Sequence, residues 1–126
     1  MMPRTLKSGK RSREAALASK KGQLENTQVI TLIDEGSASA SEIVSGAFQD
    51  NDRGLVIGRR SFGKGLVQQT RKLPYNSQLK VTVAKYYIPS GRCIQALDYS
   101  NRNEDGSVGK VPDSLISTFY TRNGRE

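Results

Sequence analysis

The stretch that decides the fold runs from residue 28 to residue 50 and reads QVITLIDEGSASASEIVSGAFQD. Its opening, residues 29–33, is apolar and rich in β-branched side chains, which predicts a buried strand. After a turn around Gly36, apolar side chains recur at helical spacing over residues 39–49, which predicts a helix. A second apolar run, residues 55–57, predicts another buried strand. Strand, helix and strand in this order indicate an α/β unit with a crossover connection.

Two longer strands are expected farther along the chain. Residues 66–73 and 79–88 resemble the two arms of a hairpin, joined by the turn-forming residues 74–77. After Pro89 the sequence predicts irregular chain with a turn over residues 103–106, and a last short helix over about residues 112–120. These patterns divide the chain into three parts: a basic polar N-terminal segment (1–27), a core (28–95) and a C-terminal extension of the core (96–126).

The net charge of +8 is concentrated near the N-terminus. Residues 1–22 hold seven basic residues and one acidic residue, and residues 14–19 are compatible with a short helix. A basic segment can bind nucleic acid, but no aromatic residues interleave this one and no recognition motif is present. A solvated basic loop is the simpler interpretation, so we expect no nucleic-acid partner and keep a basic nucleic-acid-binding module only as an alternative.

The composition excludes several classes of site. The chain contains no histidine, which rules out Ser-His-Asp and Cys-His catalysis and histidine-ligated metals. The single cysteine, Cys93, rules out an internal disulfide and a cysteine-based metal site, so neither a metal nor a cofactor is expected. No apolar run of about 18 residues could span a membrane, and no signal peptide is visible. A hydrophobic content of 35% is lean for an independent core, which suggests a piece of a larger domain.

Ser39 is the first candidate for chemistry. It lies where a strand ends, a glycine-containing turn follows and a helix begins. The first N–H groups of a helix have no intrahelical partner and can stabilise a developing oxyanion. The small neighbours Ala38 and Ala40 leave room for a substrate backbone. The alternative is that one of the serines here (Ser37, Ser39 or Ser41) merely caps the helix.

Lys64 is the second candidate, because Gly63 and Gly65 on either side allow backbone to approach it closely. A lysine acts as a general base only as the neutral amine, which requires burial, and a solvated surface lysine is the alternative. Residues 58–64 also match the first seven positions of a phosphate-binding G-x-x-x-x-G-K loop. That match fails at Gly65, where serine or threonine would bind magnesium, and the next residues predict a strand instead of the required helix.

Several motifs together resemble a known family, the carboxyl-terminal processing (tail-specific) peptidases. The motifs, in matching order and spacing, are DEGSASASEI at 34–43, Gln49-Asp50, FGKGLVQ at 62–68 and AKYYIPSGR at 84–92. The resemblance covers roughly residues 28–95, and the tail after it is similar to members from Bacteroidetes. The fold that this implies is a crotonase/Clp-protease-like α/β spiral, of which this chain would hold only part.

The resemblance also implies roles for individual residues. It makes Ser39 the nucleophile, Lys64 the general base and Gln68 the group that orients the lysine amine. The backbone N–H of Ala40 becomes an oxyanion donor, and Asp50 takes a structural role. The implied activity is that of a serine endopeptidase that uses a Ser-Lys dyad, without a cofactor, to cleave proteins near their C-termini.

Members of this family also share a PDZ domain and an upstream Gly-Gly loop, and neither is found in these 126 residues. We therefore expect the isolated chain to have little or no peptidase activity, and to self-associate through surfaces that the other parts would cover. The alternative is a catalytically inactive protein-binding piece of the same fold. The resemblance further implies protein or peptide substrates and a periplasmic or cell-envelope location for a full-length parent.

Overall fold

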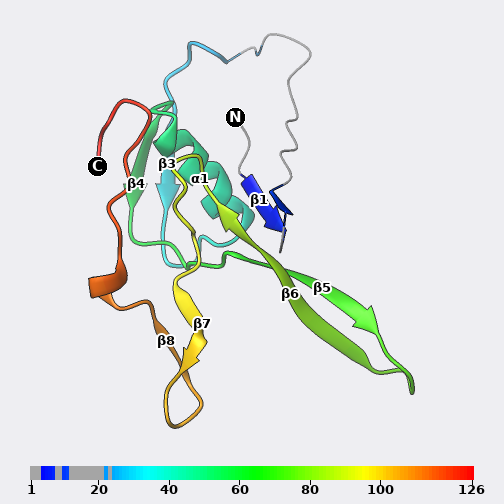
Figure 1. Ribbon diagram of the computed structural model, residues 1–126. Coiled ribbons are helices and arrows are strands. Elements are labelled where there is room, and N and C mark those ends of the chain that lie inside the picture. The colour runs from blue at the N-terminus through cyan, green and yellow to red at the C-terminus, as the bar shows by residue number, and fades with distance from the viewer. Residues whose placement is uncertain (1–3, 8–9, 12–21, 23) are drawn as a thin grey trace.

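The computed structural model describes residues 4–7, 10–11, 22 and 24–126, so the short helix considered over 14–19 lies outside the described residues. The predicted strand–helix–strand unit is formed by β3 (Ile30–Ile33), α1 (Ala40–Asp50) and β4 (Leu55–Gly58). β3 and β4 pair in parallel, with Ile30 beside Leu55 and Ile33 beside Gly58. The α/β unit is therefore confirmed. Within it, α1 packs against the strand pair through contacts with β4 (Figure 1).

A second sheet has four strands in the order β2-β1-β6-β5, and each neighbouring pair is antiparallel. Its members are β1 (Arg4–Lys7), β2 (Lys10–Arg11), β5 (Leu66–Lys72) and β6 (Gln78–Tyr87). β5 and β6 are the two arms of the predicted hairpin, which extends away from α1 as a long ribbon (Figure 1). β1 and β2 lie in the segment 1–27, where the polar sequence gave no sign of strands.

The first expectation for the C-terminal extension, irregular chain after Pro89, is wrong. β7 (Leu97–Arg102) and β8 (Val108–Lys110) form an antiparallel hairpin there. Both strands are polar, so their sequences lack the alternating apolar residues that predict a strand. Their pairing depends on the turn between them. In that turn Gly106 N–H donates to the Asn103 carbonyl at 2.8 Å, and Asn103 N–H donates to the Ser107 carbonyl at 3.0 Å.

The second expectation, a helix over residues 112–120, is also wrong. The only helical turn in this segment is η1 (Asp113–Leu115), a single 3₁₀ turn. The side chains of residues 114–118 are exposed, so no packed apolar face stabilises a longer helix.

The second half of α1 packs closely against the chain after β6. Gly46 faces Ile88, a fully buried side chain at 1% exposure, and a Cβ at residue 46 would stand 2.8 Å from its Cγ2. The Asp50 carboxylate accepts the Ser90 N–H at 2.8 Å, and the Asp50 carbonyl accepts the Arg122 N–H at 2.8 Å. These bonds fasten the chain after β6 and the C-terminal tail to α1, which supports the structural role expected for Asp50.

One face of the β3–β4 pair is uncovered. The side chains on this face are between 50% and 77% exposed, and they are Ile30, Leu32, Leu55 and Ile57. The prediction of two fully buried strands is therefore wrong for this face, because no other described residue covers it. Since parallel sheets are normally covered on both faces, this is where the expected self-association would begin, and that association stays a prediction.

The tip of the β5–β6 hairpin contains a turn whose sequence does not suit its geometry. Tyr75 and Asn76 have φ of 59° and 58°, as in a type I′ turn, and Ser77 N–H donates to the Pro74 carbonyl at 3.4 Å. Tyrosine is disfavoured at positive φ, and this side chain is fully exposed. We predict that Tyr75→Asn raises the free energy of unfolding by about 0.5–1 kcal/mol in urea denaturation. The same change at Tyr99, within β7, should give no gain; an unchanged or lowered stability for Tyr75→Asn would contradict this account.

Candidate active site

Ser39 occupies the N-cap position of α1, as the capping alternative requires, with φ 57° and ψ −114°. The preceding turn is fixed by Asp34 Oδ1, which accepts the N–H of Gly36 and both the N–H and the hydroxyl of Ser37, each at 3.0 Å. The Ser37 carbonyl in turn accepts the Phe62 N–H at 3.0 Å. The turn is thus held on both sides while Ser39 keeps a positive φ, and such strained residues cluster at functional sites.

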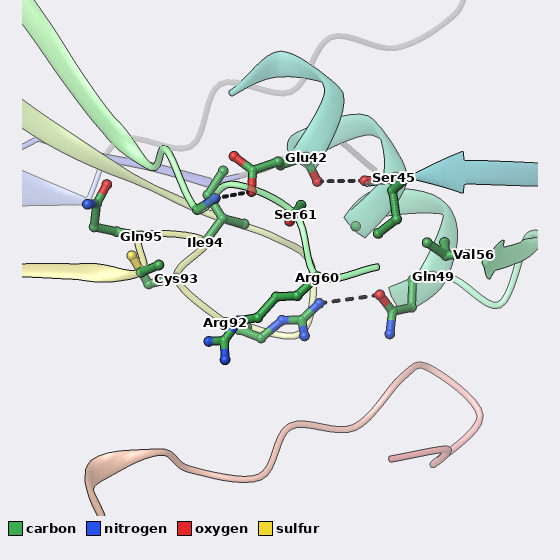
Figure 2. A pocket seen from close by; sticks show the side chains of 14 residues that line it. Glu42, Ser45, Gln49, Val56, Arg60, Ser61, Arg92, Cys93, Ile94 and Gln95 are labelled. Atoms are coloured by element: carbon green, nitrogen blue, oxygen red, sulfur yellow. Dashed lines mark hydrogen bonds between the residues drawn. The ribbon is translucent and has the colours of Figure 1, made fainter. Parts of the chain in front are cut away.

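Glu42, in the first turn of α1, joins the helix start to the loop that carries Lys64 (Figure 2). It is 4% exposed. Its Oε2 accepts the backbone N–H groups of Ser39 and Lys64, each at 2.8 Å, and its Oε1 accepts the Gly63 N–H at 2.6 Å. Because one carboxylate oxygen binds both groups, the backbones at residues 39 and 64 are held as close neighbours.

The charge of Glu42 depends on these contacts. Burial alone would raise the pKa of the Glu42 carboxyl. Hydrogen bonds from the Ser61 hydroxyl and from the backbone N–H groups of Lys64, Gly63 and Ser39 outweigh burial, so this pKa lies below its ordinary value of 4.5. Glu42 is therefore an ionised carboxylate at neutral pH, and the charge-assisted bonds fix the loop to the helix.

Residues 92–96 pack against the other side of this loop and require its glycines. Ala96 N–H donates to the Gly63 carbonyl at 3.0 Å, and Gly65 N–H donates to Gln95 Oε1 at 2.8 Å. A Cβ at residue 65 would stand 2.6 Å from the Gln95 backbone nitrogen. The close backbone approach that the glycines predicted is confirmed, while the Lys64 side chain between them is exposed.

Gly63 offers a direct test of this packing. Its φ is 86°, and a Cβ there would overlap the Cβ of Ala96. We predict that Gly63→Ala lowers the free energy of unfolding by at least about 2 kcal/mol in urea denaturation, because backbone strain and a steric clash add. Gly109→Ala is the matched control, since a Cβ at residue 109 would meet no atom within 4 Å. Equal stabilities of the two variants would show that the loop does not need glycine at residue 63.

The other two predicted site residues lie at the borders of this arrangement. Ala40 is the first residue of α1, so its backbone N–H has no intrahelical acceptor and can serve an external one. Gln68 lies on β5 and is exposed, and its amide donates to the Thr82 hydroxyl on β6 at 3.4 Å. The orienting role of Gln68 toward the lysine amine therefore stays a prediction.

Sequence reasoning missed three residues of the site: Glu42, Ser61 and Gln95. Glu42 carried a signal, because Ser39 and Glu42 have the S-x-x-E spacing of a capping box, whose acidic residue reaches back to the N-cap backbone. No sequence pattern marked Ser61 or Gln95, since each forms a hydrogen bond with a residue distant in sequence: Ser61 with Glu42, and Gln95 with Gly65.

The structure also bears on the alternatives for this region. A phosphate-binding loop needs a helix directly after it, and residues 66–72 form strand β5, so that alternative is rejected. Within the described part of the chain, no three histidine, cysteine, aspartate or glutamate side chains gather as they would around a metal ion. In that same part, no helix has the length and apolar character needed to cross a membrane.

Comparison with known proteins gives consistent matches. The sequence profile of peptidase family S41 matches residues 2–100. A carboxy-terminal-processing protease of Bartonella bacilliformis is 51% identical over 88 residues, which cover 70% of this chain and 18% of that protein. The chloroplastic carboxyl-terminal-processing peptidase 3 of Arabidopsis thaliana is 53% identical over 90 residues, which cover 71% of this chain and 15% of that protein.

A solved structure is similar as well. The photosystem II D1 C-terminal processing protease superposes with a TM-score of 0.54 at 46% sequence identity, over 56% of this chain and 18% of that one. The chain therefore spans less than one fifth of the length of these relatives.

Proposed function

The chain belongs to peptidase family S41, and on this premise we propose that Ser39 and Lys64 form the Ser-Lys dyad of a serine endopeptidase. In this proposal Gln68 orients the lysine amine and the Ala40 N–H stabilises the oxyanion. The observation that carries the proposal is that Glu42 Oε2 accepts the backbone N–H groups of both Ser39 and Lys64, each at 2.8 Å. Two residues far apart in sequence are thereby assembled around one buried carboxylate.

The proposed reaction starts when Ser39 Oγ attacks the scissile carbonyl while Lys64 Nζ accepts the hydroxyl proton. Negative charge develops on the former carbonyl oxygen near the N-terminus of α1, where the Ala40 N–H can donate. Lys64 then gives its proton to the leaving amine, and later activates the water that hydrolyses the acyl-enzyme. A dyad of this kind suits a chain without histidine.

A neutral lysine amine needs a dry environment, whereas the Lys64 side chain is exposed in the described structure. We propose that further polypeptide of a full-length enzyme covers the Lys64 loop and excludes water from it. The isolated chain should then be weakly active or inactive. The same exposure favours a second candidate, an inactive protein-binding piece of the same fold.

The names of the relatives support a substrate class. Carboxyl-terminal processing describes the Bartonella and Arabidopsis proteins, so we propose that this enzyme acts on the C-terminal regions of proteins. The likeness to the D1 processing protease supports a shared core, which we propose to be part of a crotonase/Clp-protease-like spiral. We propose a periplasmic or cell-envelope location for a bacterial full-length parent.

A chimera tests the proposal without requiring activity of the isolated chain. The matching 88 residues of this chain replace their counterpart in the Bartonella protease, and an unstructured polypeptide is the substrate. We expect endoproteolysis near the substrate C-terminus, with the new ends identified by mass spectrometry. A folded chimera that cleaves nothing, beside an active parent relative, would favour the inactive binding piece.

A further inference from the structure

A cavity of about 250 Å³ lies behind the loop that carries Lys64, between α1 and residues 92–96. Two arginines line it, Arg60 from the chain after β4 and Arg92 from the chain after β6 (Figure 2). Both also line the adjoining outer hollow of about 500 Å³. Both arginine side chains therefore border the same space, and residues 115–119 of the C-terminal tail line its outer part.

The two arginines have no matching negative charge among the described residues. Arg92 donates to the neutral Gln49 Oε1 at 3.4 Å, and no ion pair joins Arg60 or Arg92 to any described carboxylate. The inner cavity has one acidic lining residue, Glu42, and its oxygens already accept the donors of the Lys64 loop. Glu126 lines only the outer hollow and pairs with neither arginine. Two like charges at one cavity, neither of them paired with a described carboxylate, favour an anion there.

We propose that Arg60 and Arg92 form a binding site for a small oxyanion, either phosphate or a carboxylate. The guanidinium group presents a planar fork of donors that matches both of these anions and can bind them through two parallel hydrogen bonds. The neutral side chains of Gln49 and Gln95, which also line the cavity, can supply further amide donors.

The position of the site couples it to the Lys64 loop. Arg60 directly precedes Ser61, whose hydroxyl binds Glu42. Arg92 belongs to the segment whose Gln95 accepts the Gly65 N–H at 2.8 Å. An oxyanion that joins the two guanidinium groups ties together the two segments between which the loop is held, and so restrains the backbone on both sides of the lysine.

Inorganic phosphate is the probe, and the full 126-residue chain is titrated with it at constant ionic strength kept with sodium chloride. We expect phosphate to raise the melting temperature in a saturable way, because it binds the folded state. Arg60→Gln and Arg92→Gln should each weaken phosphate binding about 10-fold or more, the effect of losing a hydrogen bond to a charged group. Phosphate should also slow amide hydrogen exchange at residues 63–65, and Arg92→Gln should abolish this slowing.

Arg59→Gln is the matched control, since it removes the same charge one residue away, where Arg59 pairs on the surface with Glu35 at 3.4 Å. This variant should bind phosphate like the unmodified chain. Competition by a short peptide with a free C-terminus, but not by its amide, would identify a polypeptide carboxylate as the ligand; no competition would identify a free oxyanion. No saturable effect of phosphate or of the free peptide, or equal effects on all three variants, would overturn the proposal. None of these readouts needs peptidase activity, so they stand apart from the proposed function.

Discussion

Replacing either Ser39 or Lys64 with alanine in the chimera is expected to lower kcat/KM by at least about 10³-fold. Without the serine there is no nucleophile to form the acyl-enzyme, and without the lysine the chain offers no histidine to accept the proton. Because both residues act in one step, the double variant should be hardly worse than either single variant. The measurement is steady-state cleavage of a quenched fluorescent peptide.

Two further substitutions serve as controls for these losses. Ser41→Ala removes a neighbouring exposed serine of the same motif, and Lys80→Ala removes an exposed lysine on β6. Both should retain activity close to that of the unmodified chimera. A double variant far less active than either single variant would argue that Ser39 and Lys64 do not share a step.

Glu42→Gln is expected to have the second largest effect, because it acts on both stability and activity. The amide keeps the shape of the side chain but loses the charge, and it turns an N–H₂ group toward backbone donors. We predict a loss of about 2–4 kcal/mol in the free energy of unfolding, the range for leaving buried donors unsatisfied in a charged network. Activity of the chimera should fall too, because the backbones of Ser39 and Lys64 lose their common acceptor.

The pH dependence of this loss follows from the lowered pKa of Glu42. A carboxyl whose pKa is lower in the folded state stabilises the fold at pH values above the pKa that the same carboxyl has in the unfolded chain, which is near 4.5 for Glu42. That stabilisation disappears as the pH falls through the folded-state pKa. The stability difference between the unmodified chain and Glu42→Gln, from urea denaturation, should therefore be largest at neutral pH and shrink below about pH 4.5.

Glu104→Gln is the control for this comparison, because Glu104 is an exposed carboxylate in the turn between β7 and β8. It should change stability by less than about 0.5 kcal/mol at any of these pH values. A stability loss in Glu42→Gln that does not vary with pH would show that the charge of Glu42 is not what holds the loop.

The parts of the fold that the sequence predicted are those with strong local patterns. The apolar run before the SASAS motif, the helical spacing after it and the two arms around Pro74 each became the expected element. The β7–β8 hairpin was missed because its strands are polar, and its pairing is visible only once the turn at Gly106 brings them together. The helix expected over residues 112–120 did not form because the side chains of residues 114–118 are exposed, which local spacing cannot reveal.

The candidate site was predictable only in part, for a similar reason. A turn before a helix marked Ser39, and two flanking glycines marked Lys64, but spacing gave no reason for the two to meet. The backbones of these two residues are held close by Glu42, whose two oxygens accept N–H groups of the loop. Gln95 binds the loop from the opposite side. Contacts of this kind join segments that are distant in sequence, so no periodic pattern of residues in the sequence predicts them.

The central claim, that Ser39 is a nucleophile activated by Lys64, is tested most directly by covalent labelling. A fluorophosphonate probe reacts with activated serines, and peptide mapping by mass spectrometry locates the label. In the chimera we predict a single labelled residue, Ser39, and loss of labelling in Ser39→Ala and in Lys64→Ala, while Ser41→Ala is labelled normally. Labelling of another serine, or labelling of Ser39 that persists undiminished in Lys64→Ala, would contradict the dyad.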